Sequence, residues 1–333
     1  MISRRRFALL TMSGLTLAAC GRAGGLAGEP AGEVRLGILS PDPPSVLAAN
    51  WAPILADLRA ATGLDATPAF FDNGPEMVDA LSRGRMDVGW FDNLSGLEAV
   101  RRAGGEVFAR PIPLGLPAHA VLLAAPRRRR VTLRRVLRCD RTLRIGLGDP
   151  LSIPGSLALE TYLLAPAGKS PSTCFREVRR QPAVRNLADL SAGRLDLAAI
   201  GAAQWAKESR NLPVGAADIR EIWRSPALPA DPFVWRKDLD PAAKETIRQF
   251  LLTYGQDNAV QRARLSRIGL VGFAPADDNH LLPTREMEAV RSWLEAQRSG
   301  DRARAEAARA DYESVAAERQ ALEARTGAPA AAQ

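Results

Sequence analysis

The amino-acid sequence predicts an α/β fold of two similar lobes joined by two crossover strands, with a helical tail at the C-terminus. The order strand, helix, strand, helix, strand occurs twice, first over residues 34–91 and again over residues 143–200. One segment also recurs: residues 81–88 read LSRGRMDV, and residues 190–197 read LSAGRLDL. A repeated α/β pattern of this kind predicts two sheets of mainly parallel strands, each covered by helices.

The first unit shows alternating and helical patterns in turn. Its expected elements are a strand at 34–39, a helix at 45–61, a strand at 64–71, a helix at 75–83 and a strand at 86–91. The strands are rich in β-branched and aromatic residues, whereas the helices carry apolar residues three and four positions apart. Gly63 and Gly84 follow the two helices, where a left-handed C-terminal residue is expected.

The second unit repeats this plan. Its expected elements are a strand at 143–148, a helix at 156–164, a strand at 175–179, a helix at 184–191 and a strand at 195–200. In both copies of the repeated segment, the glycine ends a helix and the chain enters a buried strand.

The chain then returns to the first lobe. Residues 219–236 are predicted to be extended and to form the second crossover, and a helix is expected from Asp240 to Leu252. Residues 286–325 are rich in Ala, Arg and Glu and predict one long helix, which we interpret as solvated rather than as a partner-binding helix. The expected boundaries are 34–120 with 225–290 for the first lobe, 121–224 for the second, and 291–333 for the tail.

The N-terminus resembles an export signal. Residues 1–19 contain Ser-Arg-Arg-x-Phe and an apolar run, typical of a signal peptide, and the apolar run ends in Leu-Ala-Ala-Cys-Gly at residues 17–21. The paired arginines resemble a twin-arginine signal, with a general secretory signal as the alternative. This predicts a periplasmic lipoprotein that is lipidated at Cys20, with residues 20–33 as a flexible tether. The alternative is a transmembrane anchor with Cys20 as a buried thiol. Removing residues 1–19 would lower the net charge from +8 to +5.

The composition excludes several classes of protein. The chain has 333 residues, of which 46% are hydrophobic and 25% charged, values typical of a soluble globular protein and not of a disordered or polytopic membrane protein. The basic residues are nearly all arginines scattered along the chain, and the densest group, residues 127–138, is predicted to be a solvated face. We therefore expect no nucleic-acid partner.

Histidines and cysteines are few. With two histidines and three cysteines, the sequence predicts no metal site and no cofactor. In an oxidising compartment Cys139 and Cys174 could form a disulfide or remain two separate buried thiols, and the sequence leaves both open.

Candidate ligand-binding residues lie where strands end and helices begin. Such positions collect ligands at the carboxyl edge of parallel sheets, and free N–H groups at helix starts favour oxyanions. The candidates are Ser40, Asp92, Asn93, Ser95, His119, Ser152, Gly155 and Ser156. The alternative for most of them is a cap or a turn, and for His119 a hydrogen-bonded residue in the first crossover.

Several stretches, taken in order, resemble one known family. They are 50–55 with 62–64, 81–90, 148–150, 223–226 with 230–232, and 274–278. Over residues 34–290 the chain resembles the phosphate, phosphite and phosphonate substrate-binding proteins of ABC importers, a branch of the type II periplasmic binding (Venus-flytrap) fold. The resemblance implies Rossmann-like lobes, a cleft for a small anionic solute, a membrane permease as partner, and no catalysis. We expect a monomer.

The chain departs from that family at its expected ligand positions. The resemblance implies a Ser-Thr-Ser run after Gly148-Asp149-Pro150, but residues 152–154 read Ser-Ile-Pro. The two expected tyrosines align with Gly74 and Gly96, and Asp92 is an added carboxylate that would repel a dianion. The alternative functions are a periplasmic sensor subunit with an altered or lost ligand, and an enzyme on the same fold, for which no catalytic constellation is evident.

Overall fold

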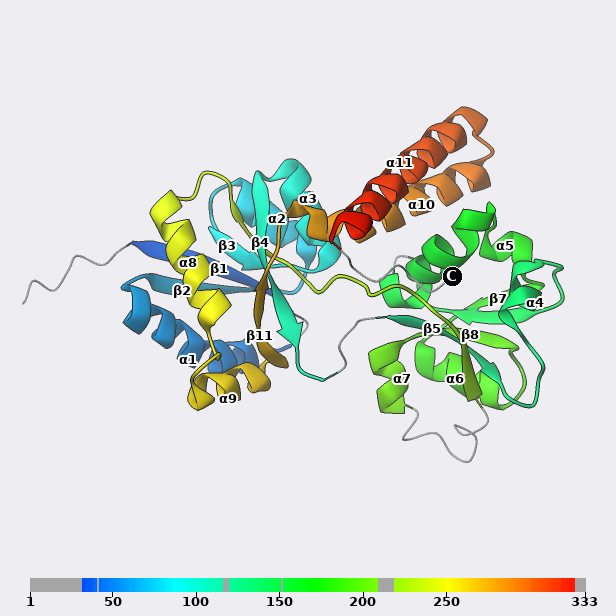
Figure 1. The fold of residues 1–333 in the computed structure, drawn as a ribbon, viewed down its shortest axis with the longest axis horizontal. Helices are drawn as coiled ribbons and strands as arrows, with labels where there is room; N and C mark the ends of the chain where they lie inside the picture. Colours follow the sequence, from blue (N-terminus) through cyan, green and yellow to red (C-terminus); the bar gives the residue numbers. More distant parts are fainter. Residues whose placement is uncertain (1–31, 41, 116–119, 151, 209–218, 327–333) are drawn as a thin grey trace, which may run out of the picture.

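The computed structural model describes residues 32–40, 42–115, 120–150, 152–208 and 219–326 as two α/β lobes with a helical hairpin at the C-terminal end (Figure 1). The predicted lipidation site Cys20 and the candidate His119 lie outside the described residues. In the described part of the chain, no helix is both long and apolar enough to cross a membrane.

The first lobe contains a six-stranded sheet in the order β11-β4-β10-β3-β1-β2. Its strands are β1 (Glu33–Leu39), β2 (Asp65–Phe71), β3 (Val88–Trp90), β4 (Gly105–Pro113), β10 (Phe233–Arg236) and β11 (Leu270–Pro275). Its helices are α1 (Pro44–Thr62), α2 (Gly74–Ser82), α3 (Asn93–Arg102), α8 (Pro241–Thr253) and α9 (Ala259–Arg267).

The second lobe contains a five-stranded sheet in the order β7-β6-β8-β5-β9. Its strands are β5 (Val121–Pro126), β6 (Arg144–Leu147), β7 (Glu177–Arg180), β8 (Leu197–Gly201) and β9 (Ile219–Arg224). Its helices are α4 (Leu133–Leu137), α5 (Pro171–Cys174), α6 (Ala183–Ser191) and α7 (Ala202–Glu208), with irregular turns η1 (Ile153–Leu157), η2 (Glu160–Leu164) and η3 (Ala165–Ala167).

The two sheets share one topology. In each, the first strand lies between the second and third in parallel register, with Ile38 opposite both Phe70 and Trp90 in the first lobe. In each, the strand that arrives from the other lobe is inserted antiparallel beside the third: β10 beside β3, and β5 beside β8. The predicted fold of two lobes joined by two crossovers is confirmed, whereas the exact lobe boundaries stay a prediction.

The repeated segment has the same structural role in both lobes. Asp87 and Asp196 are buried, and each accepts hydrogen bonds from the backbone N–H and the guanidinium of an arginine on the first strand, Arg35 and Arg144 respectively. A second arginine, Arg236 at the end of β10 and Arg129 after β5, pairs with the same carboxylates. Burial alone would raise the pKa of Asp87, but the hydrogen bonds from Arg35 lower it.

The predicted helix at 156–164 is replaced by two turns of wide, π-type helix, η1 and η2. Pro154 lies in the first turn of η1, where backbone N–H groups have no acceptor within the helix, so its missing N–H is compatible with a helix that starts here. The helix therefore begins earlier than predicted, with Ser152 as its cap.

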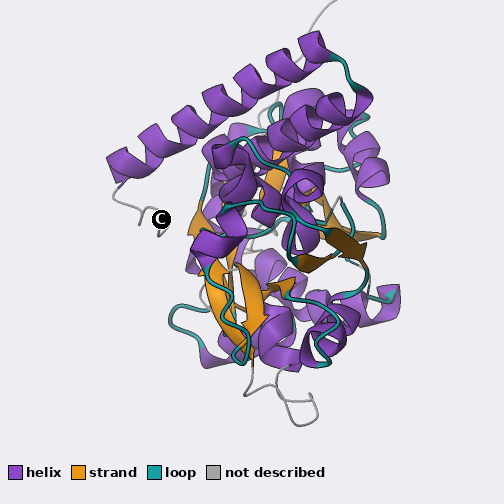
Figure 2. Cartoon of the chain, turned by 90° about the vertical axis from the view of Figure 1, so that its right-hand side faces the viewer, coloured by secondary structure: helices purple, strands orange, loops and turns teal. Residues whose placement is uncertain are grey.

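The C-terminal region forms two helices rather than one. Helix α10 (Leu282–Ser299) ends at Gly300, whose φ of 74° lies in the left-handed region, and α11 (Arg302–Thr326) folds back along it (Figure 2). The Trp293 and Tyr312 rings stack 6.1 Å apart, and the buried Arg319 of α11 binds Glu286 of α10 at 2.5 Å. The interpretation of this region as a solvated helix is wrong for its inner face, which is packed.

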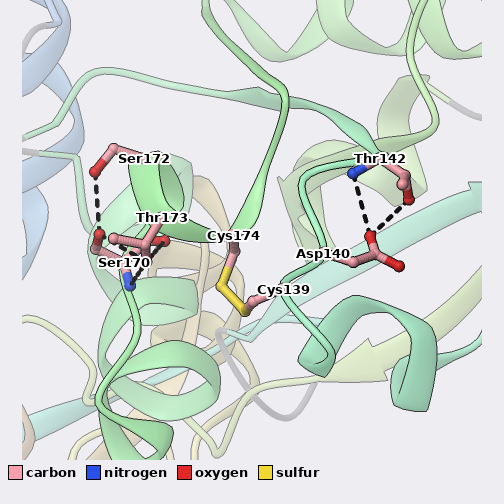
Figure 3. The surroundings of a disulfide bond; sticks show 7 residues. All are labelled: Cys139, Asp140, Thr142, Ser170, Ser172, Thr173 and Cys174. Carbon is pink, nitrogen blue, oxygen red and sulfur yellow. Dashed lines mark hydrogen bonds between the residues drawn. A yellow bond between two sulfur atoms is a disulfide. The ribbon is translucent and has the colours of Figure 1, made fainter.

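The two cysteines of the second lobe form a disulfide. Cys139 follows α4, Cys174 ends α5, and the bond joins residues 35 positions apart (Figure 3). Figure 3 also shows the polar groups beside it, where Ser170 interacts with Ser172 and Thr173 at the start of α5. The alternative of two separate thiols is therefore excluded.

Candidate functional site

A cavity of about 500 Å³ lies at the carboxyl edge of the second sheet, and we call it the lobe-2 cavity. It is bordered by residues that follow β6, β7 and β8, the edge where parallel sheets collect ligands. Its lining residues include Gly148, Asp149, Pro150, Ser152, Pro154, Gly155, Arg180, Gln181, Gly201 and Gln204.

Two of the predicted residues shape the loop of this cavity. The Ser152 hydroxyl accepts a hydrogen bond from the Gly155 N–H at 3.2 Å, so Ser152 caps η1 as the alternative interpretation suggested. Gly155 allows close backbone approach, because a Cβ on it would lie 3.0 Å from the Gly148 Cα. The Gly148 N–H donates to the Gly155 carbonyl at 2.8 Å and fixes the loop beside β6.

Arg180 is a cavity residue that the sequence reasoning missed. Its guanidinium donates to the Ser156 hydroxyl at 2.8 Å and lies 3.3 Å from Glu160 Oε1. Ser156 is fully buried and donates to Glu160 at 2.5 Å, so its hydroxyl supports Arg180 and does not line the cavity. A signal was present in the sequence, because Arg180 comes directly after a predicted strand, like the residues that were chosen.

A larger cavity of about 800 Å³ lies between the lobes, and we call it the interlobe cavity. The first lobe contributes the starts of α2 and α3 and part of the second crossover, and the second lobe contributes Ile153 and Pro154. Helix α10 forms a further wall with Glu288 and Arg291. Pro154 lines both this cavity and the lobe-2 cavity, so the two are neighbours.

The predicted residues Asp92, Asn93 and Ser95 lie together on the first-lobe wall of the interlobe cavity. Asp92 caps α3, with its Oδ1 accepting from the Ser95 N–H at 2.8 Å. Asn93 is buried and donates to Asp231 Oδ1 at 2.9 Å and to the Pro229 carbonyl at 3.0 Å. These bonds join the start of α3 to the second crossover.

Asp231 is the carboxylate with the strongest perturbation at this wall. Burial and the nearby negative charge of Asp92 raise its pKa to about 7, although the hydrogen bond from Asn93 acts in the opposite direction. The first-lobe wall is therefore acidic, with Asp92, Glu98 and Asp231 all lining the cavity. Sequence reasoning anticipated the added charge at Asp92 but not the second carboxylate.

Ser40 is separate from both cavities. It follows β1, donates its N–H to the Phe71 carbonyl at 3.0 Å and accepts from the Asp42 N–H at 3.2 Å. It lines neither the lobe-2 cavity nor the interlobe cavity. Helix α1 begins after Pro43 without a side-chain cap, so this turn offers its backbone rather than a set of hydroxyls.

The lobe-2 cavity offers a hydroxyl, amides and a guanidinium, which suit an oxyanion. Within the described ranges, no group of three or more His, Cys, Asp or Glu side chains is arranged to hold a metal ion.

Comparisons with known proteins agree with this architecture. A sequence model for the periplasmic substrate-binding protein of ABC phosphonate transporters matches residues 36–281. The phosphonates-binding periplasmic protein of Escherichia coli K12 is 30% identical over 267 residues, covering 78% of each chain.

Solved structures show the same fold. A binding protein component of an ABC phosphonate transporter from Pseudomonas aeruginosa has a TM-score of 0.57 and 27% identity, covering 89% of this chain and 98% of its own. A Prochlorococcus marinus protein in complex with methylphosphonate has a TM-score of 0.54 and 17% identity, covering 77% of this chain and 96% of its own.

Proposed function

The chain belongs to the family of periplasmic substrate-binding proteins of ABC phosphonate transporters, and on that premise we propose that its cleft binds a small phosphonate-like oxyanion. It is a solute-binding component of an importer, so the solute is passed on to a membrane permease. Residues 1–19 and Cys20 would act as the export signal and the lipid anchor that holds the protein at the membrane.

The arrangement of the lobe-2 cavity carries the proposal. Ser152, the Gly155 turn and Arg180 meet at the carboxyl edge of the second sheet, where a tetrahedral anion can accept several hydrogen bonds. Arg180 is oriented by Ser156 and Glu160, so its guanidinium is held in place before a ligand arrives.

The test is calorimetric titration with methylphosphonate, inorganic phosphate and methanesulfonate. Tight binding of one of them is expected, and Arg180→Met should weaken it at least tenfold because a charge-assisted hydrogen bond is lost. Arg185→Met is the matched control, since Arg185 is exposed on α6 of the same lobe and does not line the cavity.

Two results would contradict the proposal. No binding of any of the three anions would favour a sensor with an altered ligand. The acidic wall of the interlobe cavity supports that alternative, because it would repel an anion. Equal losses in Arg180→Met and Arg185→Met would show that net charge, and not this cavity, governs the affinity.

A further inference from the structure

Helix α10 connects the two lobes through residues that the family match does not include. The match ends at residue 281, and α10 begins at Leu282. Leu281 belongs to the apolar core around α2 and α3 of the first lobe, whereas Met287 is buried in the core of the second lobe. Figure 1 shows the hairpin starting beside α3 of the first lobe and extending over the second lobe.

The polar side of α10 forms part of the interlobe cavity. Glu288 binds Arg101 of α3 at 2.6 Å and is therefore held toward the first lobe. Arg291, one turn further along, approaches Glu288 only at 3.5 Å, and its side chain keeps 31% of its surface exposed. Arg291 also lines a second cavity of about 540 Å³ beneath the hairpin, so it has space on both sides.

The other walls of the interlobe cavity offer an anion little support. On the second lobe Ile153 has an apolar side chain and Pro154 has no N–H to donate. On the first lobe Asp92, Glu98 and Asp231 are acidic. An oxyanion that reaches this wall therefore needs a cation to offset the repulsion and the lost hydration.

Among the residues that the structure describes, two cationic side chains line the cavity, Arg102 and Arg291. Arg102 is bound to Glu98 on its own helix at 3.1 Å and keeps 77% of its surface exposed. Arg291 is more buried, is more weakly paired, and lies on the same cavity as Pro154, which also borders the lobe-2 cavity.

We propose that Arg291 of the C-terminal hairpin is a ligand-binding residue, which donates to the oxyanion from outside both lobes. This inference rests on the proposed function. It assigns to α10 a positive charge that is less exposed and more weakly paired than that of Arg102, the cation that the first lobe presents to the interlobe cavity. A tetrahedral oxyanion bound beside Ser152 and Arg180 would thus have a third group of donors on the side of Pro154.

The experiment compares single variants of the full chain by calorimetric titration with methylphosphonate at low and high salt. Arg291→Met should lower the affinity at least tenfold, and Arg291→Lys should recover part of it because the charge returns without the planar guanidinium. Glu288→Gln should raise the affinity, since it removes the competing carboxylate.

Arg298→Met is the matched control. Arg298 lies on the same helix and lines the cavity beneath the hairpin but not the interlobe cavity. Its guanidinium donates a hydrogen bond to the Leu294 carbonyl of the same helix at 3.4 Å. The affinity of Arg298→Met for methylphosphonate should be within twofold of that of the unaltered protein. Thermal unfolding without ligand, equal in Arg291→Met and Arg298→Met, would show that the fold is intact.

The outcomes separate the two claims. If the unaltered protein binds and Arg291→Met binds equally well, the role of Arg291 is wrong and the proposed function stands. Equal losses in Arg291→Met and Arg298→Met would assign the effect to overall charge and would overturn the inference. If no variant and no unaltered protein binds methylphosphonate, phosphate or methanesulfonate, both claims fail.

Discussion

The two lobes fix their central strands in the same way but differ at the opposite edge of the sheet. On one side, Asp87 and Asp196 are each bound by an arginine of the first strand and by a second arginine, which ends the inserted strand in the first lobe and follows it in the second. On the other side, β3 is followed by Asp92 and Asn93, whereas β8 ends in Gly201 and is followed by Ala202.

The comparison shows that the residues that stabilise each lobe lie at one edge of the sheet, whereas the residues available to a ligand lie at the other edge. The buried carboxylate closes the turn between a helix and a strand, so any change there leaves charges unpaired. The carboxyl edge carries no such requirement. There the first lobe presents Asp92, Glu98 and Asp231 to its cavity, and the second presents Arg180. Four predictions test this comparison, from the largest expected effect to the smallest.

The disulfide should stabilise the second lobe alone. Replacing Cys139 and Cys174 with serine should cost about 3 to 4 kcal/mol, because the bond closes a long loop in the unfolded chain. Hydrogen exchange should show lower protection in β6 and β7 and unchanged protection in β1 and β3. Equal losses in both lobes would mean that they unfold as one unit.

The two buried carboxylates should be equivalent. Asp87→Asn and Asp196→Asn should each cost about 2 to 3 kcal/mol, less than a fully buried pair because Arg35 and Arg129 are 40% and 41% exposed. Urea denaturation measures both. Asp238→Asn, at an exposed partner of Arg236, is the control and should leave the stability unchanged. A large effect at only one carboxylate would break the comparison.

The acidic wall should make the free protein less stable as pH rises. Since the folded-state pKa of Asp231 is raised to about 7, the folded state binds its proton more tightly than the unfolded state. Stability is then greatest below the unfolded pKa and should fall by about 2.5 kcal/mol between pH 5 and pH 8. Asp231→Asn should remove this dependence in urea titrations.

The charged groups around Asp231 provide a comparison variant for this experiment. Asp92 faces it from α3, Glu98 and Arg102 line the same cavity, α10 adds Glu288 and Arg291, and His280 binds the neighbouring Ala230 carbonyl. Asp92→Asn should lower the pKa of Asp231, so the free energy of unfolding should depend less steeply on pH but should still depend on it. If the free energy of unfolding of Asp231→Asn depends on pH as it does in the unaltered protein, the dependence belongs to His280 or another group.

Replacing the two glycines that follow α2 and α6 should lower the stability by slightly different amounts. Gly84 and Gly193 have φ values of 62° and 71°, so alanine at either position should cost about 1 kcal/mol. Gly84→Ala should cost more, because its Cβ would lie 2.7 Å from Arg236 Nη1, whereas at Gly193 the nearest atom is 3.3 Å away. Thermal unfolding of both variants measures the difference, and the reverse order would contradict it.

Much of the fold could be predicted because the repeated elements carry strong local patterns. The strands β1, β2, β6 and β8 have clear apolar runs, and their helices end at glycines. The break at Gly300 was missed although Ser299-Gly300-Asp301 contained the signal, since Asp301 accepts from the Arg304 N–H and caps α11. An Ala- and Arg-rich composition hid this short interruption.

The candidate site was less predictable, since cavities are formed by side chains from distant segments. Arg180, Asp231 and Arg291 come from three separate segments of the chain. Arg180 directly follows a predicted strand, but no local pattern distinguishes Asp231 or Arg291 from other charged residues. Ser156 followed the expected motif but is buried against Glu160. Sequence spacing located the loops correctly and could not show which side chains face the cavities.

Helix α10 also restricts how the lobes can move. Only six residues separate Leu281 in the first core from Met287 in the second, about 9 Å along a helix axis. A rigid segment this short keeps the two cores at a constant separation at that point. Opening and closing must then be a rotation about this pivot, in which residues far from it travel most, rather than a parting of the lobes along their whole boundary.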